Sequence, residues 1–228
     1  MIHGSETAQH LARESAMAYD PNVDGIRFDN DTCHCVVRRD AIGNIIIAFR
    51  GTEMDRDDWQ SNLKKAQTCW FNLRVHSGFA ASLAPLMPAI RIAVGELHHK
   101  GNQVWTCGHS RGGAHALLAT VALVKMNIRV AGCYTYGCPR VGDSNFAAWC
   151  DEHLPGHHRY VYQSDIVTRL PISGYRHCGK IHWHNGREWA DSMPWWTRIG
   201  AYMFARRWPL IGDSASDHSI GHYIGALQ

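Results

Sequence analysis

The stretch from Val104 to Met126 holds a serine in a setting that suits nucleophilic catalysis. Ser110 is the centre of a Gly-X-Ser-X-Gly sequence, Gly108-His109-Ser110-Arg111-Gly112, between an apolar strand-like run and an Ala- and Leu-rich helical pattern. A serine in such a turn adopts a strained backbone that lifts its hydroxyl clear of the sheet, and only small neighbours let strand and helix pack around it. The pattern therefore predicts a nucleophile elbow.

A serine hydroxyl needs a base to take its proton and an acid to orient that base. On a strand-turn-helix architecture these follow in the order Ser, Asp or Glu, then His. Asp165 lies just after a strand-like run, residues 158–162. The carboxyl ends of strands are where α/β sheets place their active sites. An Asp at such a position is also common as a turn cap. The candidate bases are His177, His182, His184, His218 and His222. A late-loop position favours the last two, and spacing does not choose between them.

Attack on an ester leaves an oxyanion that requires preorganised hydrogen-bond donors. One expected donor is the backbone N–H of Arg111, which follows the nucleophile. The second is expected after an earlier central strand, where Arg50-Gly51-Thr52 stands. Thr52 is also explained as a simple strand cap, but the preceding glycine permits the close backbone approach that an oxyanion hole requires.

Strand-like and helical runs alternate over most of the 228 residues. This alternation predicts an α/β fold, with a mostly parallel central sheet, helices on both faces, and a single domain over residues 1–228. The expected helices are 8–19, a long one from about 80 to 100 that Pro88 can kink, 113–126, and one ending near 153. The expected strands are 33–39 with 44–50 as a hairpin, 68–75, 103–107, 129–136 and 158–162.

Composition and charge restrict the classes of function that this chain could have. The net charge of +3 is too small and scattered to indicate a nucleic-acid partner, and no run approaches the roughly 18 apolar residues of a transmembrane helix. The first residues lack a basic region followed by an apolar core, so no signal peptide is visible and the compartment stays open. Reduced thiols are expected for the eight cysteines. Three of them lie in or beside predicted buried strands: Cys107, Cys133 and Cys138.

The segment at about 187–215 differs from the rest in being rich in tryptophan and arginine. Trp195, Trp196 and Trp208 belong to a run that reads as an aromatic and basic amphipathic helix. One interpretation packs its aromatic face on the core. The other makes it a flap over the site, or a surface for transient contact with lipid.

Metal binding is a poor match to the histidine-rich parts of the chain. Cys33-His-Cys35 and His182-Trp-His184 lack the paired spacings of a structural zinc site. His182 and His184 would share a strand face, which leaves a surface site open. A serine-based mechanism requires no metal, and no cofactor is expected.

Together these residues resemble the class 3 lipases, the fungal-lipase-like branch of the α/β-hydrolases. The motifs that carry the resemblance are Phe49-Arg-Gly-Thr52, Asp58-Trp59 with Asn62, Val75-His-Ser-Gly-Phe79, Gly108 to Gly113, Tyr136-Gly-Cys-Pro-Arg-Val-Gly142, Asp165 to Pro171, Gly174-Tyr-Arg-His177 with Gly179, and Asp217-His-Ser-Ile220 with Tyr223. The resemblance implies an α/β-hydrolase fold, with Ser110 as nucleophile, Asp165 as acid and His218 as base. It also implies that Thr52 supplies both its hydroxyl and its N–H to the oxyanion hole, and it ranks His222 second as base.

Two departures from that pattern affect the expected substrate. The fungal members carry an amphipathic lid after the oxyanion residue, whereas Glu53 to Asp58 is short and acidic with only Met54 apolar. Arg111 replaces the apolar residue usual after the nucleophile, and a guanidinium near the acyl path favours a short or polar acyl chain.

The sequence thus predicts a serine carboxylic-ester hydrolase, lipase or esterase, that cleaves acylglycerols or other fatty-acyl esters through an acyl-enzyme on Ser110. A phospholipase A1, a short-chain soluble esterase and an acyltransferase would use the same site, since fold does not choose among them. A non-catalytic lipid-binding protein with the same fold is the alternative from another class.

Overall fold

Eight strands form one sheet in the computed structural model, which describes residues 5–51, 66–194 and 217–228. The order across the sheet is β1-β2-β3-β6-β7-β8-β9-β10. The strands are β1 (Ile26–Asp29), β2 (His34–Arg39), β3 (Ile45–Arg50), β6 (Val104–His109), β7 (Gly132–Tyr136), β8 (His157–Tyr162), β9 (Lys180–His184) and β10 (Trp189–Ala190). Neighbours from β3 to β9 pair in parallel, and the outer pairs are antiparallel.

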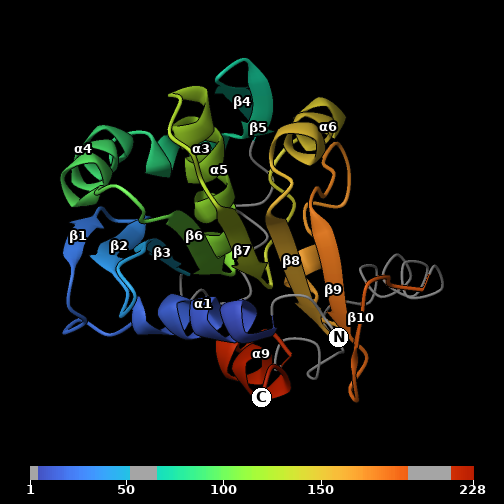
Figure 1. Cartoon of the computed structure of the whole chain (residues 1–228). Helices are drawn as coiled ribbons and strands as arrows, with labels where there is room; N and C mark the ends of the chain where they lie inside the picture. The colour runs from blue at the N-terminus through green and yellow to red at the C-terminus, as the bar shows by residue number, and fades with distance from the viewer. Residues whose placement is uncertain (1–4, 52–65, 195–216) are drawn as a thin grey trace.

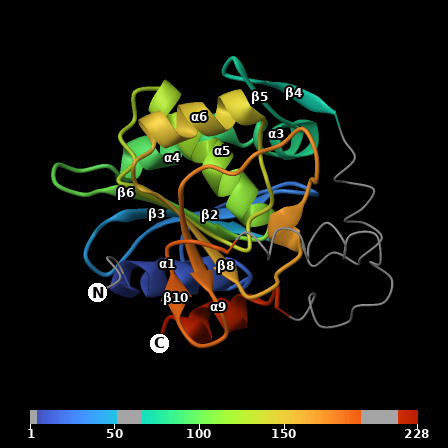
Figure 2. The ribbon, with the colours of Figure 1, turned by 90° about the vertical axis from the view of Figure 1, so that its right-hand side faces the viewer.

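Helices cover both faces of this sheet (Figure 1). On one face lie α3 (Ser77–Leu83), α4 (Met87–Leu97), α5 (Arg111–Lys125) and α6 (Ser144–His153), and on the other lie α1 (Ser5–Met17) and α9 (Ile220–Ala226). The turned view separates the same two layers (Figure 2). Strand β3 shows why both layers are needed. Ile45, Ile47 and Phe49 belong to one hydrophobic core, while Ile46 and Ala48 belong to the other. A central strand with both faces buried is an apolar run without alternation.

The expected architecture is therefore confirmed, including the antiparallel pairing of β2 with β3. Two expected elements were wrong in detail. The run 68–75 is not one strand but a hairpin of β4 (Gln67–Trp70) and β5 (Leu73–His76), because Phe71 and Asn72 take left-handed conformations that turn the chain. The long helix towards residue 100 is two helices, α3 and α4, bent by 54°. The break includes Pro85, which has no N–H to donate to a preceding carbonyl.

The sequence analysis also missed some elements, β1 and α9 among them. Strand β1 is short and largely exposed, so it has no apolar pattern. The segment around His222 is the short helix α9 rather than a loop, begun by the Ser219 hydroxyl, which accepts a hydrogen bond from the Gly221 N–H.

Within the described ranges, no single helix has the length and apolarity that crossing a membrane requires, although the bent pair α3–α4 meets that test when taken together. All eight cysteines carry free thiols. Cys107, Cys133 and Cys138 are buried, as expected from their place in or beside central strands.

The burial of His115, in α5, leads to a prediction about how stability depends on pH. His115 is fully buried and contacts the Ser82 hydroxyl at 2.8 Å. Burial, with the nearby Arg111 charge, lowers the pKa of His115 to about 3. The unfolded chain, with a histidine pKa of about 6.5, therefore binds the proton first as the pH falls. We expect the free energy of unfolding to decrease below pH ~6.5, by up to about 1.4 kcal/mol per pH unit from this group.

Urea unfolding at pH 7.5, 6.5, 5.5 and 4.5 measures this dependence. The His115→Gln variant serves as the control, because it removes one titrating group and should make the slope shallower. A slope identical in the two proteins would contradict the assignment.

Candidate active site

Ser110 lies between β6 and α5 in a strained turn. Its φ of 58° and ψ of −129° are unusual for a residue with a side chain. A Cβ on Gly108 would overlap the Gly112 carbonyl, and one on Gly112 would overlap the Phe49 carbonyl. Both glycines are thus required for the strand and helix to approach each other, which is what the elbow pattern predicted.

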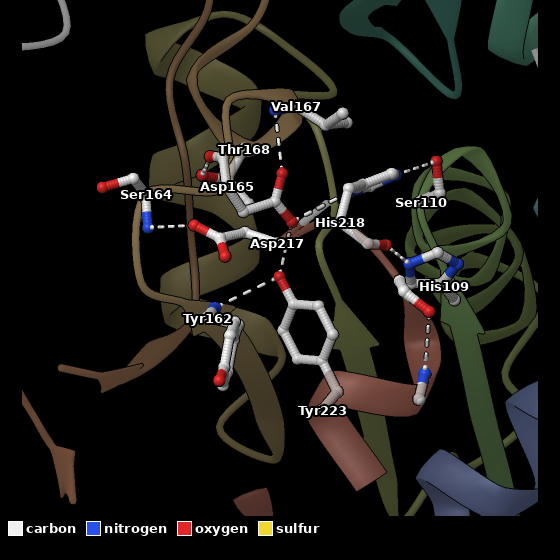
Figure 3. Close-up of polar contacts among 12 residues, drawn as sticks. His109, Ser110, Tyr162, Ser164, Asp165, Val167, Thr168, Asp217, His218 and Tyr223 are labelled. Atoms are coloured by element: carbon white, nitrogen blue, oxygen red, sulfur yellow. Dashed lines mark hydrogen bonds and ion pairs between the residues drawn. The ribbon is translucent and has the colours of Figure 1, made fainter. Parts of the chain in front are cut away.

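A chain of hydrogen bonds runs from Ser110 to a buried carboxylate (Figure 3). The Ser110 Oγ is 2.7 Å from His218 Nε2, and His218 Nδ1 is 2.8 Å from Asp165 Oδ2. Because the carboxylate accepts, Nδ1 carries the proton and Nε2 is free to accept from the serine. Ser110 comes from the end of β6, Asp165 from the loop after β8, and His218 from the chain just before α9.

Besides His218, two groups hold the Asp165 carboxylate in place. The Val167 N–H donates to Oδ1 at 2.9 Å, and the Tyr223 hydroxyl donates to Oδ2 at 2.5 Å. Burial and the Asp165 charge raise the pKa of Tyr223 well above its usual value, so this hydroxyl stays a donor. Asp165 itself is fully buried, and these donors offset part of the cost of desolvating its charge.

The histidine of the elbow supports the candidate base from the other side. With Nε2 protonated, His109 donates to the backbone carbonyl of His218 at 2.6 Å, and its Nδ1 accepts from the Tyr19 hydroxyl at 3.1 Å. Burial, followed by the nearby His218, holds the pKa of His109 well below its ordinary value. A neutral His109 can therefore serve as acceptor and donor at once. It fixes the backbone of His218.

The other candidate bases make their contacts elsewhere. The His222 ring stacks on Tyr162, with the centroids 5.3 Å apart. His177 contacts the Thr168 carbonyl, and His184 stacks on Tyr162. His182 contacts His158 Nδ1 at 2.9 Å and the Asp191 carboxylate at 3.1 Å. Of the five, the structure places His218 against Ser110.

The predicted oxyanion hole is described in part. Gly51, at the end of β3, lies against the elbow, where a Cβ would come within 3.1 Å of the Ser110 Cβ and 2.8 Å of the His109 carbonyl oxygen. Thr52 follows it and lies outside the described residues. Arg111 begins α5, and its side chain is largely buried. Its Nε has no hydrogen-bond partner among the described residues, and burial lowers its pKa.

Other parts of the expected site also lie outside the described ranges. These are the acidic segment Glu53 to Asp58 and the tryptophans Trp195, Trp196 and Trp208. Of the segment at about 187–215, the structure describes only the beginning, where β10 pairs with β9. Across the described ranges, no three His, Cys, Asp or Glu side chains gather as a metal site would require.

Sequence reasoning did not predict the contacts that three residues bordering the site make: Tyr19, Gly137 and Tyr223. Gly137 has a φ of 61°, and a Cβ there would lie 2.8 Å from Asp165 Oδ2 and 3.0 Å from the His218 ring. Its place between a strand and Cys138-Pro139 predicted a turn, but not the contact of that turn with Asp165 and His218. Tyr19 gave no signal, because its partner His109 is far away in the sequence. Tyr223 was noticed only as part of a motif, without its hydrogen bond to Asp165.

A sequence model of the family described as "Lipase (class 3)" matches residues 46–175, which is more than half of the chain. The chain belongs to the class 3 lipase family. It is 32% identical over 149 residues to the secreted mono- and diacylglycerol lipase 1 of Fusarium solani, a match that covers 62% of this chain and 44% of that protein. It is 31% identical over 164 residues to a lipase of Rhizomucor miehei, covering 67% of this chain and 45% of the other.

The structural comparison extends this likeness to the fold. The crystal structure of a mono- and diacylglycerol lipase from Aspergillus oryzae matches with a TM-score of 0.72 at 22% identity, covering 78% of each chain. The expected α/β-hydrolase fold of this class 3 lipase family member is thereby confirmed. The chain spans less than half the length of these two sequence relatives.

Gly137 generates a prediction about the site. We expect Gly137→Ala to reduce the kcat of p-nitrophenyl ester hydrolysis at least about 100-fold, equivalent to about 3 kcal/mol. The added methyl would press on both the Asp165 carboxylate and the His218 ring. A left-handed alanine also costs about 1–3 kcal/mol of stability.

Gly43→Ala is the matched control, because Gly43 is also left-handed, with a φ of 88°, but has open space around its Cα. It should lose similar stability and retain activity. Equal kcat values for the two variants would mean that Gly137 does not shape the site.

Proposed function

We propose that this chain is a carboxylic-ester hydrolase that cleaves acylglycerols or other fatty-acyl esters through an acyl-enzyme on Ser110. The observation that carries the proposal is the hydrogen-bonded chain Ser110–His218–Asp165 at a strained elbow. Relatives in the class 3 lipase family are named as lipases of mono- and diacylglycerols, which supports the substrate class. A protein that only bound lipid would gain nothing from a strained serine.

In the proposed reaction, Ser110 Oγ attacks the ester carbonyl while His218 Nε2 takes the hydroxyl proton. The imidazolium that results is stabilised by the adjacent Asp165 carboxylate, which Tyr223 and Val167 hold in place. The backbone N–H of Arg111 and the N–H and hydroxyl of Thr52 are the proposed oxyanion donors, each worth about 3 kcal/mol in the transition state.

The attack forms a tetrahedral intermediate. Its collapse releases the alcohol, which receives the proton from His218, and leaves the acyl group on Ser110. Water then attacks the acyl-enzyme, with His218 again taking a proton, and the free acid departs. Each proton that His218 accepts is returned within the same half-reaction. The proposed reaction uses no metal or cofactor.

Arg111 favours a second candidate, a short-chain esterase. Its guanidinium belongs to the residue that follows the nucleophile, is largely buried, and has no ion pair within the described ranges. A long acyl chain near an uncompensated charge would lose part of its favourable burial, whereas a polar or short chain would lose less. Transient contact with a lipid surface through Trp195, Trp196 and Trp208 belongs to the lipase alternative.

The catalytic assignment predicts the effect of three substitutions. Ser110→Ala and His218→Ala should each reduce kcat for p-nitrophenyl butyrate by at least about 1,000-fold, because a triad fails as a unit. His222→Ala should retain most activity, since its ring stacks on Tyr162. If Ser110→Ala keeps a kcat close to that of the wild type on any ester, the nucleophile is wrong, and if only His222→Ala fails, the base is wrong.

The acyl-chain preference is predicted from Arg111. Across p-nitrophenyl esters from acetate to palmitate, we expect kcat/KM to fall for the longer chains. Arg111→Leu should raise the palmitate-to-butyrate ratio of kcat/KM about tenfold, or about 1.4 kcal/mol, by removing the charge. The ratio is the readout, because both substrates share any change in the oxyanion hole. A wild-type preference that rises with chain length and with emulsified substrate would favour a true lipase.

A further inference from the structure

The loop that carries Asp165 contains little regular secondary structure. It runs from Asp165 to Ile172, and its one regular turn is the three-residue 3-10 helix η1 (Val167–Arg169). A turn this short leaves the carbonyls at its end without partners inside the turn. The direction in which Asp165 points at His218 therefore depends on what the carbonyls of this loop contact.

The first part of the loop is held mostly by its own groups. The Thr168 hydroxyl donates to the Asp165 carbonyl at 2.8 Å (Figure 3), and two backbone N–H groups close the turn of η1. The Thr168 carbonyl accepts from His177 Nε2 at 2.5 Å. These contacts fix Asp165 relative to η1. The far end of the loop is held by another part of the chain.

Arg140 contacts each carbonyl at that far end. Its side-chain Nη1 donates to the Arg169 carbonyl at 2.7 Å and to the Pro171 carbonyl at 2.6 Å. The same nitrogen is 3.4 Å from the Ile172 carbonyl, and the Arg140 backbone N–H donates to the Leu170 carbonyl at 2.7 Å. A basic side chain beside the end of a helical turn binds its last carbonyls. Hydrogen bonds from a charged donor are roughly twice as strong as neutral ones.

The segment that carries Arg140 is itself fixed, and it borders the candidate active site. It begins at Gly137, where a Cβ would lie 2.8 Å from Asp165 Oδ2. It ends at Asp143, which caps α6 with its side chain and donates its N–H to the Arg74 carbonyl at 3.1 Å. Arg140 thus has a set position relative to β7 and α6, and its hydrogen bonds pass that position on to the loop.

We propose that Arg140 is a positioning residue for the ester hydrolysis: by binding the carbonyls of residues 169–172, it holds the Asp165 carboxylate in line with the His218 ring. The inference rests on the proposed function, since it concerns how well that reaction runs. Arg140 acts through the backbone of the loop. Without its side chain the loop would shift, and a displacement of about 1 Å can lower a rate about 100-fold.

The position of Asp165 affects both the orientation of His218 and the stability of the imidazolium that forms in the reaction. A displaced carboxylate stabilises the imidazolium less, so the base is protonated only at lower pH. The acid limb of the pH profile of kcat/KM reports this protonation. It should therefore move to lower pH when Arg140 is removed, while kcat falls.

The direction of this movement separates positioning from a direct effect of charge. Removing the Arg140 charge by itself would favour a cation at His218 and move the acid limb to higher pH. A purely structural role would move the limb in neither direction, provided that the protein is folded. The titratable or charged side chains around the His218–Asp165 pair stay in place in the substitution: His109, Asp217, Tyr223 and Arg169.

The test compares Arg140→Met and Arg140→Lys in the full chain, assayed well below the melting temperature of each variant. Methionine has no donor, whereas lysine keeps a single charged nitrogen on a shorter side chain. We expect kcat for p-nitrophenyl butyrate to fall about 100-fold in Arg140→Met and about tenfold in Arg140→Lys. KM should change little, and the acid limb should move to lower pH in both variants.

Arg39→Met is the matched control. The Arg39 guanidinium also binds a backbone carbonyl, that of Leu97, from Nε at 3.3 Å and from Nη2 at 2.8 Å, but it joins β2 to the end of α4. It should keep the kcat and the pH profile of the wild type. The same kcat and profile in Arg140→Met would overturn the proposal. If Arg140→Met does not fold, an unchanged kcat and acid limb in Arg140→Lys would overturn it.

A measurement without substrate gives a second test. The proton that His218 Nδ1 donates to Asp165 Oδ2 should produce a downfield ¹H NMR resonance, assigned by its loss in His218→Ala. We expect this resonance to weaken or move upfield in Arg140→Met and to persist in Arg39→Met. A resonance unchanged in Arg140→Met would overturn the proposal. If the wild type shows no Ser110-dependent ester turnover, the proposed function is wrong, and the resonance still decides whether Arg140 positions Asp165.

Discussion

The backbone of Ser110 is the constraint on which the rest of the site depends. A residue with a side chain holds a positive φ only where its surroundings over-determine it. Here β3, β6 and α5 approach one another so closely that Gly51, Gly108 and Gly112 have no room for a Cβ. The parallel centre of the sheet and the packing of α5 against it therefore fix the position of the serine hydroxyl. The α/β-hydrolase fold of this class 3 lipase family member supplies that geometry before any other side chain of the site is considered.

A second requirement is the burial of a negative charge. Asp165 has no exposed surface, and a buried carboxylate persists only when hydrogen bonds replace its water. His218, Tyr223 and the Val167 N–H are those donors. His109 and Tyr19 then tie the His218 backbone to the elbow and to the segment after α1. The arrangement orients the His218 imidazole between the Ser110 hydroxyl and the Asp165 carboxylate. Gly137 has no Cβ and so leaves space for the Asp165 carboxylate and the His218 ring.

The sequence predicted the parallel sheet, the elbow and the acid because these depend on local patterns. Ile45 to Phe49 is apolar throughout, and the order of Ser110, Asp165 and a late histidine follows the chain. It failed where local signals were weak or conflicting. The turn at Phe71 and Asn72 lacks glycine and proline, so the β4–β5 hairpin read as one strand. The helical periodicity from α3 into α4 continued across a break that the fold bends by 54°.

The sequence by itself determined which residue types stand at the elbow and in what order the candidate acid and bases follow, because spacing along a chain carries that information. It did not separate His218 from His222, and it gave no sign that Tyr19 contacts His109 or that Tyr223 contacts Asp165. Those pairs are distant in sequence, and only the packing of helices onto the sheet brings them together. The strained serine was thus predictable from one strand–helix junction. The groups that orient His218 and enclose Asp165 depend on contacts among five separate parts of the chain, which tertiary structure alone decided.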